Sequence, residues 1–316
     1  MRVHSPPRRS VRLWPAAVVV AGAVLAQVHL TVPAHAAVPT GCVVVPLLGN
    51  NTITCAAGIP AGQTLDAGPG NDTVIIVGTV RGTLNGGNGG NGDDRITITG
   101  LPGVLDRSPA GPAVGTGGVV DAGPGTDRVT ATGGTGTIDF DPDEPETGGA
   151  GTLGTVRGGT GTDTLTVNGG TGGVDAAGLG GEGGPGAGPG GIVDGGTGTD
   201  TITARGGNGA PAETVGLLTD STGGNGVAVQ GSVIGGGDGD TIGALGGQGD
   251  LSNGSGVAGA VTGGPGNDRI NAAVTTGVVA YQEHGGDGVT SSGSVDGEDG
   301  NDTCNATGGT IINCQN

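Results

Sequence analysis

Hydrophobic and polar positions alternate in short stretches along most of the chain, and each stretch follows a glycine-rich turn. The clearest copy, VDGGTGTDTIT, runs from Val193 to Thr203 and consists of a G-G-x-G-x-D turn, one polar residue and one aliphatic residue. Period-two alternation is typical of strands with one buried face. In all eight copies the position two places after the aspartate is aliphatic or cysteine, so we expect it to point into a core: Val74, Ile96, Val129, Leu165, Ile202, Ile242, Ile270 and Cys304.

The position between the aspartate and the aliphatic residue is only ever Thr or Arg, which predicts an outward-facing strand position. Weaker echoes of the turn lie between the copies, and the turns at Gly195, Gly206 and Gly223 recur 40 residues later. Glycine-rich turns that recur at intervals and are joined by short β-rich pieces are typical of a solenoid. We therefore predict an all-β fold, a parallel β-solenoid of the β-helix or β-roll type. We expect the segment 179–191, nearly all glycine, to form a flexible bulge.

Four regions follow from this pattern. Residues 1–36 have a basic start, an apolar run and an A-x-A site at Ala34 to Ala36, which together predict a secretory signal peptide. Residues 37–65 are expected to form an N-terminal entry cap, 66–303 the solenoid with eight repeats, and 304–316 a C-terminal cap. Localisation is therefore expected to be extracellular or at the cell surface.

The net charge of the chain limits the classes of partner that we expect. After residue 36 the chain keeps all 29 acidic residues and seven arginines, without lysine, for a formal charge of −22. Such a chain repels nucleic acid and anionic membranes and attracts cations, so we expect no nucleic-acid partner and no stable membrane insertion after signal cleavage. One Phe and one Tyr remain in this part, so a conventional aromatic core is not available. We therefore expect a thin core to which every repeat adds a few side chains. The 79 glycines of the chain show no strict every-third-residue period, which excludes collagen.

The four cysteines lie at the two ends of the predicted mature chain: Cys42 and Cys55, then Cys304 and Cys314. In a secreted chain this placement favours one disulfide at each terminus. Other pairings remain open at this point.

The glycine turn itself suggests a ligand. Glycines permit positive φ, so consecutive carbonyl groups can curl towards one point beside the fixed aspartate, and hard oxygen ligands of this kind suit Ca²⁺. An alternative interpretation is that the aspartates hydrogen-bond turn amides. In the sixth copy Asp238 replaces a turn glycine, and we expect it to distort that turn. The candidate calcium ligands are Asp72, Asp94, Asp127, Asp163, Asp200, Asp240, Asp268 and Asp302.

On copies such as GGTGTDTIT, GGPGNDRIN and GEDGNDTCN, the chain resembles the haemolysin-type calcium-binding repeat (RTX) proteins. The resemblance implies a parallel β-roll with calcium between turns, held by the eight motif aspartates and glycine-turn carbonyls. The chain departs from the family because each motif stands alone within 22 to 40 residues. Four further aspartates, six places before a motif aspartate, are either additional ligands or solvated turn residues: Asp66, Asp121, Asp194 and Asp296.

Little in the sequence favours catalysis. His284 is the single histidine after residue 36, and no G-x-S-x-G motif occurs. We therefore expect no enzymatic activity. The predicted function is a secreted, acidic, glycine-rich structural protein that binds calcium, with binding coupled to folding and with possible contacts at the cell surface or in the extracellular matrix. The alternatives are a metal-independent surface scaffold or adhesive protein and a β-helix enzyme acting on polysaccharide.

Overall fold

The computed structural model describes residues 38–47, 49–87, 91–104, 109–137, 146–174, 179–210, 221–249, 252–274 and 288–315. These residues belong to the second of two units of the chain, His35–Asn316. The predicted signal peptide and His284 lie outside the described residues.

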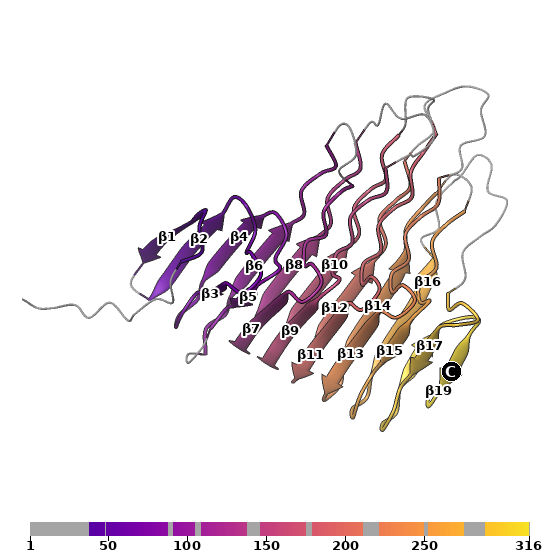
Figure 1. Ribbon diagram of the computed structural model, residues 1–316. Helices are drawn as coiled ribbons and strands as arrows, with labels where there is room; N and C mark the ends of the chain where they lie inside the picture. The colour runs from indigo at the N-terminus through magenta and orange to yellow at the C-terminus, as the bar shows by residue number, and fades with distance from the viewer. Residues whose placement is uncertain are drawn as a thin grey trace, which may run out of the picture. The chain divides into compact units, whose positions relative to one another are not determined.

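The regular elements of the described residues are all β-strands, in agreement with the predicted fold class (Figure 1). Most strands are three to six residues long, and glycine turns separate them. Short segments rich in β-branched residues are expected to form such strands. The strands are β1 (Cys42–Leu47), β2 (Asn50–Cys55), β3 (Thr64–Asp66), β4 (Thr73–Val77), β5 (Thr83–Asn85), β6 (Arg95–Thr99), β7 (Val119–Gly125), β8 (Arg128–Thr132), β9 (Thr155–Gly161), β10 (Thr164–Asn168), β11 (Ile192–Thr197), β12 (Thr201–Arg205), β13 (Ser232–Gly237), β14 (Thr241–Gly246), β15 (Ala260–Thr262), β16 (Arg269–Val274), β17 (Ser294–Asp296), β18 (Thr303–Asn305) and β19 (Thr310–Ile312).

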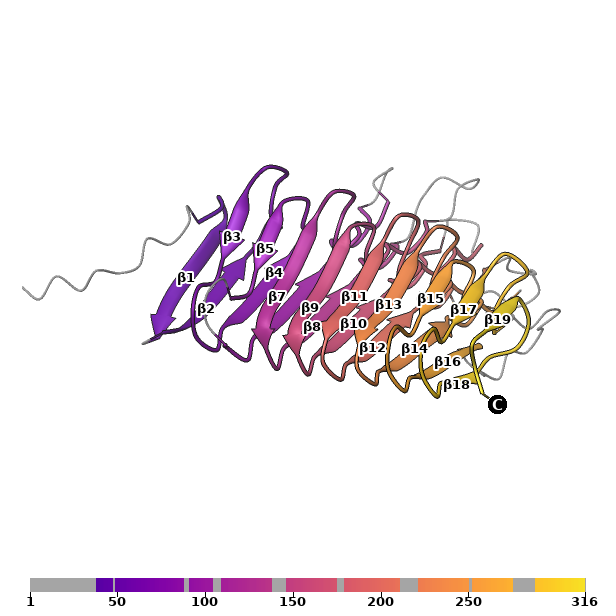
Figure 2. The same cartoon turned by 90° about the horizontal axis from the view of Figure 1, so that it is seen from below.

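Two long sheets are built from alternate strands. The ten-stranded sheet has the order β1-β2-β4-β6-β8-β10-β12-β14-β16-β18, and the nine-stranded sheet has the order β19-β17-β15-β13-β11-β9-β7-β5-β3. All pairs in the two sheets are parallel except β1 with β2, which are antiparallel. From β3 onwards, each pass of the chain adds one strand to each sheet, so that a rung is repeated along both sheets (Figure 2). The predicted parallel β-solenoid is confirmed.

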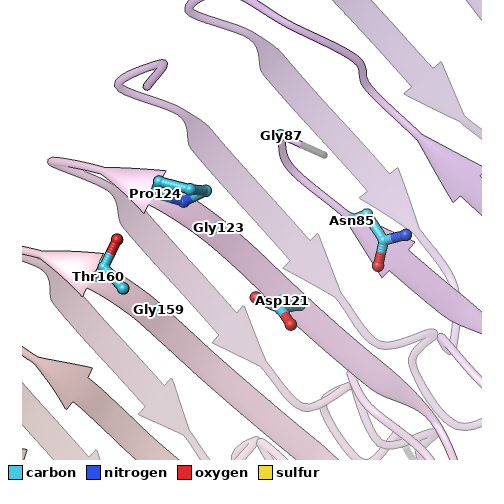
Figure 3. A pocket seen from close by; sticks show the side chains of 7 residues that line it. All are labelled: Asn85, Gly87, Asp121, Gly123, Pro124, Gly159 and Thr160. Carbon is cyan, nitrogen blue, oxygen red and sulfur yellow. The ribbon is translucent and has the colours of Figure 1, made fainter. Parts of the chain in front are cut away.

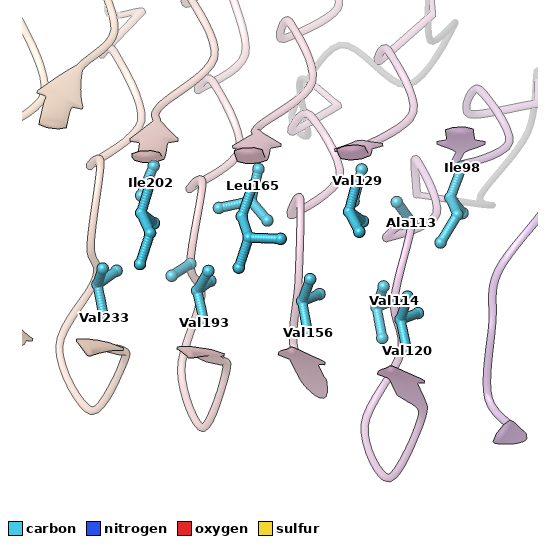
Figure 4. Close-up of a cluster of buried hydrophobic side chains, with 14 of the residues drawn as sticks. Ile98, Ala113, Val114, Val120, Val129, Val156, Leu165, Val193, Ile202 and Val233 are labelled. Carbon is cyan, nitrogen blue, oxygen red and sulfur yellow. The ribbon is translucent and has the colours of Figure 1, made fainter. Parts of the chain in front are cut away.

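The core is a thin stack of aliphatic side chains between the two sheets (Figure 4). Val129, Leu165 and Ile202 on the ten-stranded sheet occupy equivalent places in successive strands, and Val193 and Val233 do the same on the nine-stranded sheet. A third buried column follows isolated parallel bridges between rungs: Ile59, Val80, Val114, Thr152, Ala187, Val227, Val257 and Val289. Each rung therefore buries its small hydrophobic set only by stacking on its neighbours.

A second packed region consists of glycine backbone rather than side chains. We call it the glycine lobe: the stretches 100–104, 133–137, 169–174, 206–210 and 247–249, which leave the ten-stranded sheet, and the stretches 109–113, 146–151, 179–186, 221–226 and 252–256, which return. A continuous series of amide-to-carbonyl bonds alternates between outgoing and returning stretches, each 2.7–2.9 Å long. The donor and acceptor pairs are Gly134 to Gly111, Gly149 to Gly134, Gly170 to Gly149, Gly184 to Gly170, Gly207 to Gly184, Gly224 to Gly207, Gly247 to Gly224 and Gly254 to Gly247.

Glycine is required in the lobe because the backbones touch. A Cβ placed on Gly207 would lie 2.0 Å from the carbonyl oxygen of Gly170, and one on Gly170 would lie 1.8 Å from that of Gly134. As at the axis of collagen, only glycine fits such spacing. The expectation of a flexible bulge at 179–191 is therefore wrong. Gly184 is buried, donates its amide to Gly170 and accepts the amide of Gly207, because the missing side chains allow close packing rather than freedom.

Disulfides lie near both ends of the described chain, as predicted. Cys42 pairs with Cys55 across β1 and β2, and Cys304 pairs with Cys314. Cys304 is 5% exposed in the inward column of β18, and Cys55 is fully buried. The two bridges tie the first and last rungs onto the core, and they indicate folding in an oxidising environment.

The glycine lobe yields a test of its close packing. Replacement of Gly207 by Ala places a methyl group against backbone that cannot move independently, and we expect the free energy of unfolding to fall by about 1–3 kcal/mol or more. Gly243, on the outer face of β14, is the matched control, because the nearest atom to an added Cβ is 3.9 Å away. Thermal melting should show a lower melting temperature for Gly207→Ala and an unchanged melting temperature for Gly243→Ala. Equal effects would contradict the packing.

Candidate functional site: a buried aspartate ladder

The eight motif aspartates come together in one column, one per rung, at the turn between the two sheets. Each is between 0% and 2% exposed. The Oδ1 atom of each accepts a hydrogen bond from the backbone amide of the residue one rung earlier, so every aspartate reaches back along the solenoid. We call this column the aspartate ladder. Its amide-to-Oδ1 bonds run from Asn51 to Asp72, and then, at 2.7–2.8 Å, from Asp72 to Asp94, Asp94 to Asp127, Asp127 to Asp163, Asp163 to Asp200, Asp200 to Asp240, Asp240 to Asp268 and Asp268 to Asp302.

Glycines place the carboxylates in two ways. The residue four places before the aspartate has positive φ in most rungs, for example 103° at Gly196 and 104° at Gly264, as the sequence predicts. The residue five places before lies against the carboxylate. A Cβ on Gly195 would be 2.6 Å from Oδ2 of Asp200 and 2.3 Å from the carbonyl oxygen of Gly235 in the next rung. An Oδ2 atom and a carbonyl oxygen of the next rung therefore both lie close to this glycine.

Asn51 is a ladder residue that the sequence analysis missed. Its neighbour Thr52 is in register with Thr73, so Asn51 occupies the place of a motif aspartate at the start of the column. Its amide Nδ2 donates to the carbonyl oxygen of Ala67 at 2.7 Å, and Ala67 stands five places before Asp72. The signal was present in the sequence, because NNTIT at residues 50–54 matches the NDTVI of the first motif. At Asn51 a donor satisfies the carbonyl that faces the ladder.

The aspartates have no such donor. The Oδ2 atoms of seven of them are buried and have no hydrogen-bond partner, although Oδ1 is bonded in each: Asp94, Asp127, Asp163, Asp200, Asp240, Asp268 and Asp302. Where Asn51 presents N–H to a carbonyl oxygen, a charged aspartate presents a second acceptor. An unpaired buried carboxylate oxygen is costly, and the cost disappears when a positive species lies between the two oxygens.

Electrostatics agrees with the geometry. Burial is the largest cause that raises the pKa of six ladder carboxyl groups, those from Asp94 to Asp268. Neighbouring ladder carboxylates raise the pKa of several of them further, while the amide hydrogen bond to Oδ1 lowers it. The pKa is raised to about 6 at Asp94 and Asp200, and to about 7 at Asp127 and Asp240. The pKa values of Asp163 and Asp268 are also raised, with burial again the first cause. These ladder carboxyl groups therefore keep their protons to a higher pH than ordinary aspartates do.

The ladder differs from a carboxylate cage. No group of three or more His, Cys, Asp or Glu side chains in the described residues is arranged to hold a metal ion. An ion at the ladder would have to take one or two carboxylate oxygens, with carbonyl oxygens completing its shell. Such a set of hard oxygens is compatible with Ca²⁺.

The four aspartates six places before a motif lie on the outer face of the nine-stranded sheet, where they are half-buried. Oδ1 of Asp66 accepts the amide of Gly68 at 3.1 Å, and Oδ1 of Asp296 accepts the amide of Glu298 at 3.0 Å. Both residues therefore end a strand and accept a hydrogen bond from the turn that follows it. Asp121 lines a hollow of about 370 Å³ with Asn85, Pro124 and Thr160 (Figure 3), where it is the charged lining residue.

The fold and the ladder define a class: a disulfide-closed parallel β-solenoid with a buried column of aspartates. No family model matches the chain, no curated protein matches it, and no solved structure matches it. The resemblance to haemolysin-type repeats therefore rests on the motif and on a fold consistent with a β-roll. Within the described part of the chain, no helix is long and apolar enough to cross a membrane.

The raised pKa values predict an unusual dependence of stability on pH. Because the folded pKa lies above the unfolded value of about 3.9, the folded state binds more protons between about pH 4 and 7, and stability falls as pH rises through this window. In chelator, the melting temperature should fall from pH 5 to pH 8. The double variant Asp127→Asn/Asp240→Asn should flatten this fall and melt higher at pH 8, because asparagine supplies the donor seen at Asn51. A profile identical to that of the parent would contradict the ladder.

Asp238 replaces a turn glycine and adopts a φ of 71°. The ladder bonds on both sides of its rung are retained at 2.7 Å, so the expected distortion does not reach the ladder. Its cost is backbone strain, together with charge close to Asp200 and Asp240.

Asp238→Gly should therefore stabilise the protein by about 1 kcal/mol, measured by denaturant unfolding. Asp238→Asn removes the charge and keeps the side chain, which separates strain from repulsion. A glycine variant no more stable than the asparagine variant would show that the turn is not strained.

Proposed function

We propose that the protein is an extracellular structural repeat protein whose aspartate ladder binds calcium, with binding coupled to folding. The observation that carries the proposal is the set of seven buried Oδ2 atoms without hydrogen-bond partners. Each lies where Asn51 places an N–H group towards a carbonyl oxygen. A cation at this place would bridge carboxylate and carbonyl oxygens and remove the repulsion between successive rungs.

Charge and chemistry favour calcium among the available cations. The surroundings are oxygen atoms, and the ladder belongs to a chain with a net charge of −18. Because no carboxylate cage is present in the described residues, we expect weak sites, with dissociation constants of about 10⁻⁴–10⁻³ M, as in extracellular calcium modules. Extracellular calcium is abundant enough to fill sites of this strength. The role is structural rather than enzymatic in this proposal.

A second candidate is a metal-independent scaffold in which protons, not calcium, neutralise the ladder. The continuous series of amide-to-Oδ1 bonds from Asn51 to Asp302 favours it, because the column is connected without any ion. The raised pKa values of Asp127 and Asp240 favour it as well. The two candidates make different predictions about calcium at a pH above these pKa values.

At pH 8, calcium should raise the melting temperature if the first proposal holds. Calcium at about thirty times the dissociation constant stabilises the folded state by about 2 kcal/mol per site. The Asp127→Asn/Asp240→Asn variant should lose most of this response. Asp194→Asn, which removes one charge from the outer face of the nine-stranded sheet, should keep it.

The control separates ion binding from general screening. Magnesium at the same concentration should stabilise less, because it demands octahedral geometry and releases its water reluctantly. If calcium leaves the melting temperature of the parent unchanged, the calcium proposal is wrong and the proton-neutralised scaffold stands. If the ladder variant and the control respond equally, calcium binds elsewhere.

A further inference from the structure

The outer face of the ten-stranded sheet has an unusual charge for so acidic a protein. Four of the seven arginines after residue 36 point outward from its strands and are exposed: Arg95 on β6, Arg128 on β8, Arg205 on β12 and Arg269 on β16. The other described outward positions of β2 to β18 are Thr, Asn, Gly, Ala, Ile, Val or Leu, and none is acidic. We call this surface the arginine face. Three of these arginines directly follow a ladder aspartate in the sequence, but those aspartates are buried, and the exposed Asp93 lies at the turn before β6.

The opposite sheet shows the contrast. The outer face of the nine-stranded sheet carries Asp66, Asp121, Asp194 and Asp296, with Arg157 as its one described arginine. Acidic residues outnumber basic ones by 29 to 11 in the whole chain, so a long sheet surface free of carboxylates is a departure from the composition. The two faces of the solenoid therefore differ in sign.

Two of the arginines also stand where their charges repel each other and destabilise the sheet. Arg95 and Arg128 stand directly beside each other in adjacent parallel strands, about 4.8 Å apart along the sheet. Like charges at neighbouring strand positions are destabilising. The same column continues as Thr164, Thr201 and Thr241, so threonine fits this position without repulsion. An anion that contacts both guanidinium groups would offset the repulsion.

A column of threonines runs next to the column that holds Arg95 and Arg128. Thr97, Thr130, Thr166 and Thr203 form an unbroken column beside the arginine column, one residue per strand. Hydroxyl groups donate and accept hydrogen bonds, and guanidinium groups bind carboxylates in a bidentate manner. From β6 to β16 the face covers five strand spacings, about 24 Å, which suits an extended polymer rather than a small molecule.

We propose that the arginine face binds an extended carboxylate-bearing polysaccharide, that is, a chain of uronic acid units. Arginines would bind the sugar carboxylates, and threonines would bind the sugar hydroxyls. The described outward positions hold no aromatic side chain, and stacking on aromatic side chains is the usual means of holding single-stranded nucleic acid. The uronic acid polymer is therefore the better match. The proposal concerns the surface of the sheet and is independent of calcium at the ladder.

The test is binding to immobilised polygalacturonate, measured in chelator at low salt so that calcium cannot bridge protein and polymer. We expect Arg95→Thr/Arg128→Thr to weaken binding about tenfold or more, because each guanidinium–carboxylate contact is charge-assisted. Arg205→Thr/Arg269→Thr should act in the same direction. Thr stands at the same columns in other strands, as Thr201 and Thr132 show, so both double variants should fold.

Arg157→Thr is the matched control, because it removes one arginine from the other sheet and should leave binding unchanged. Methyl-esterified polygalacturonate, which lacks the carboxylates, should bind at least tenfold more weakly than the acid form. The proposal is overturned if the parent does not bind polygalacturonate, if Arg157→Thr weakens binding as much as the double variants do, or if the esterified polymer binds equally well. Tighter binding to an oligothymidylate than to polygalacturonate would instead identify a nucleic-acid surface and would also overturn it.

Discussion

The hydrogen bond from one ladder amide to the next ladder carboxylate is the interaction on which the rest of the turn depends. It fixes the position of Asp200 relative to Asp163 and so sets the start of the following strand in register. Because the carboxylate is buried, its second oxygen lowers the stability of the folded state unless it is neutralised. Asn51 shows the neutral solution at the first rung, with an N–H group directed at a carbonyl oxygen. The later rungs keep aspartate, which leaves a buried carboxylate oxygen without a donor in each of the rungs from Asp94 to Asp302.

Glycine has a different purpose in each part of the rung. At Gly196 it supplies a positive φ, at Gly195 it leaves room for the carboxylate, and at Gly207 it lets backbones approach closely in the glycine lobe. The lobe has no aliphatic column of its own, so its stability comes from backbone hydrogen bonds and close contact. A chain with almost no aromatic residues thus folds by two means, a thin aliphatic stack and packed glycine backbone.

Local periodicity was enough to predict the sheets, the inward column from Val74 to Cys304 and the two terminal disulfides, because each depends on neighbours in sequence or on position at an end. The glycine lobe could not be predicted in this way. GGTG at Gly133 resembles the motif turn without its aspartate, yet it contacts Gly149 in another stretch of the lobe. The direction of the ladder hydrogen bonds could not be predicted either, since it depends on the register between rungs 22 to 40 residues apart.

Carboxyl carbon NMR of the protein labelled at the aspartate side chain tests the central claim, that the ladder carboxylates are buried and lack a positive partner. In chelator, the resonances of Asp127 and Asp240, assigned by their loss in the asparagine variants, should titrate near pH 7, and those of Asp94 and Asp200 near pH 6. Titration of all four near pH 4, together with the surface aspartates, would contradict the buried ladder.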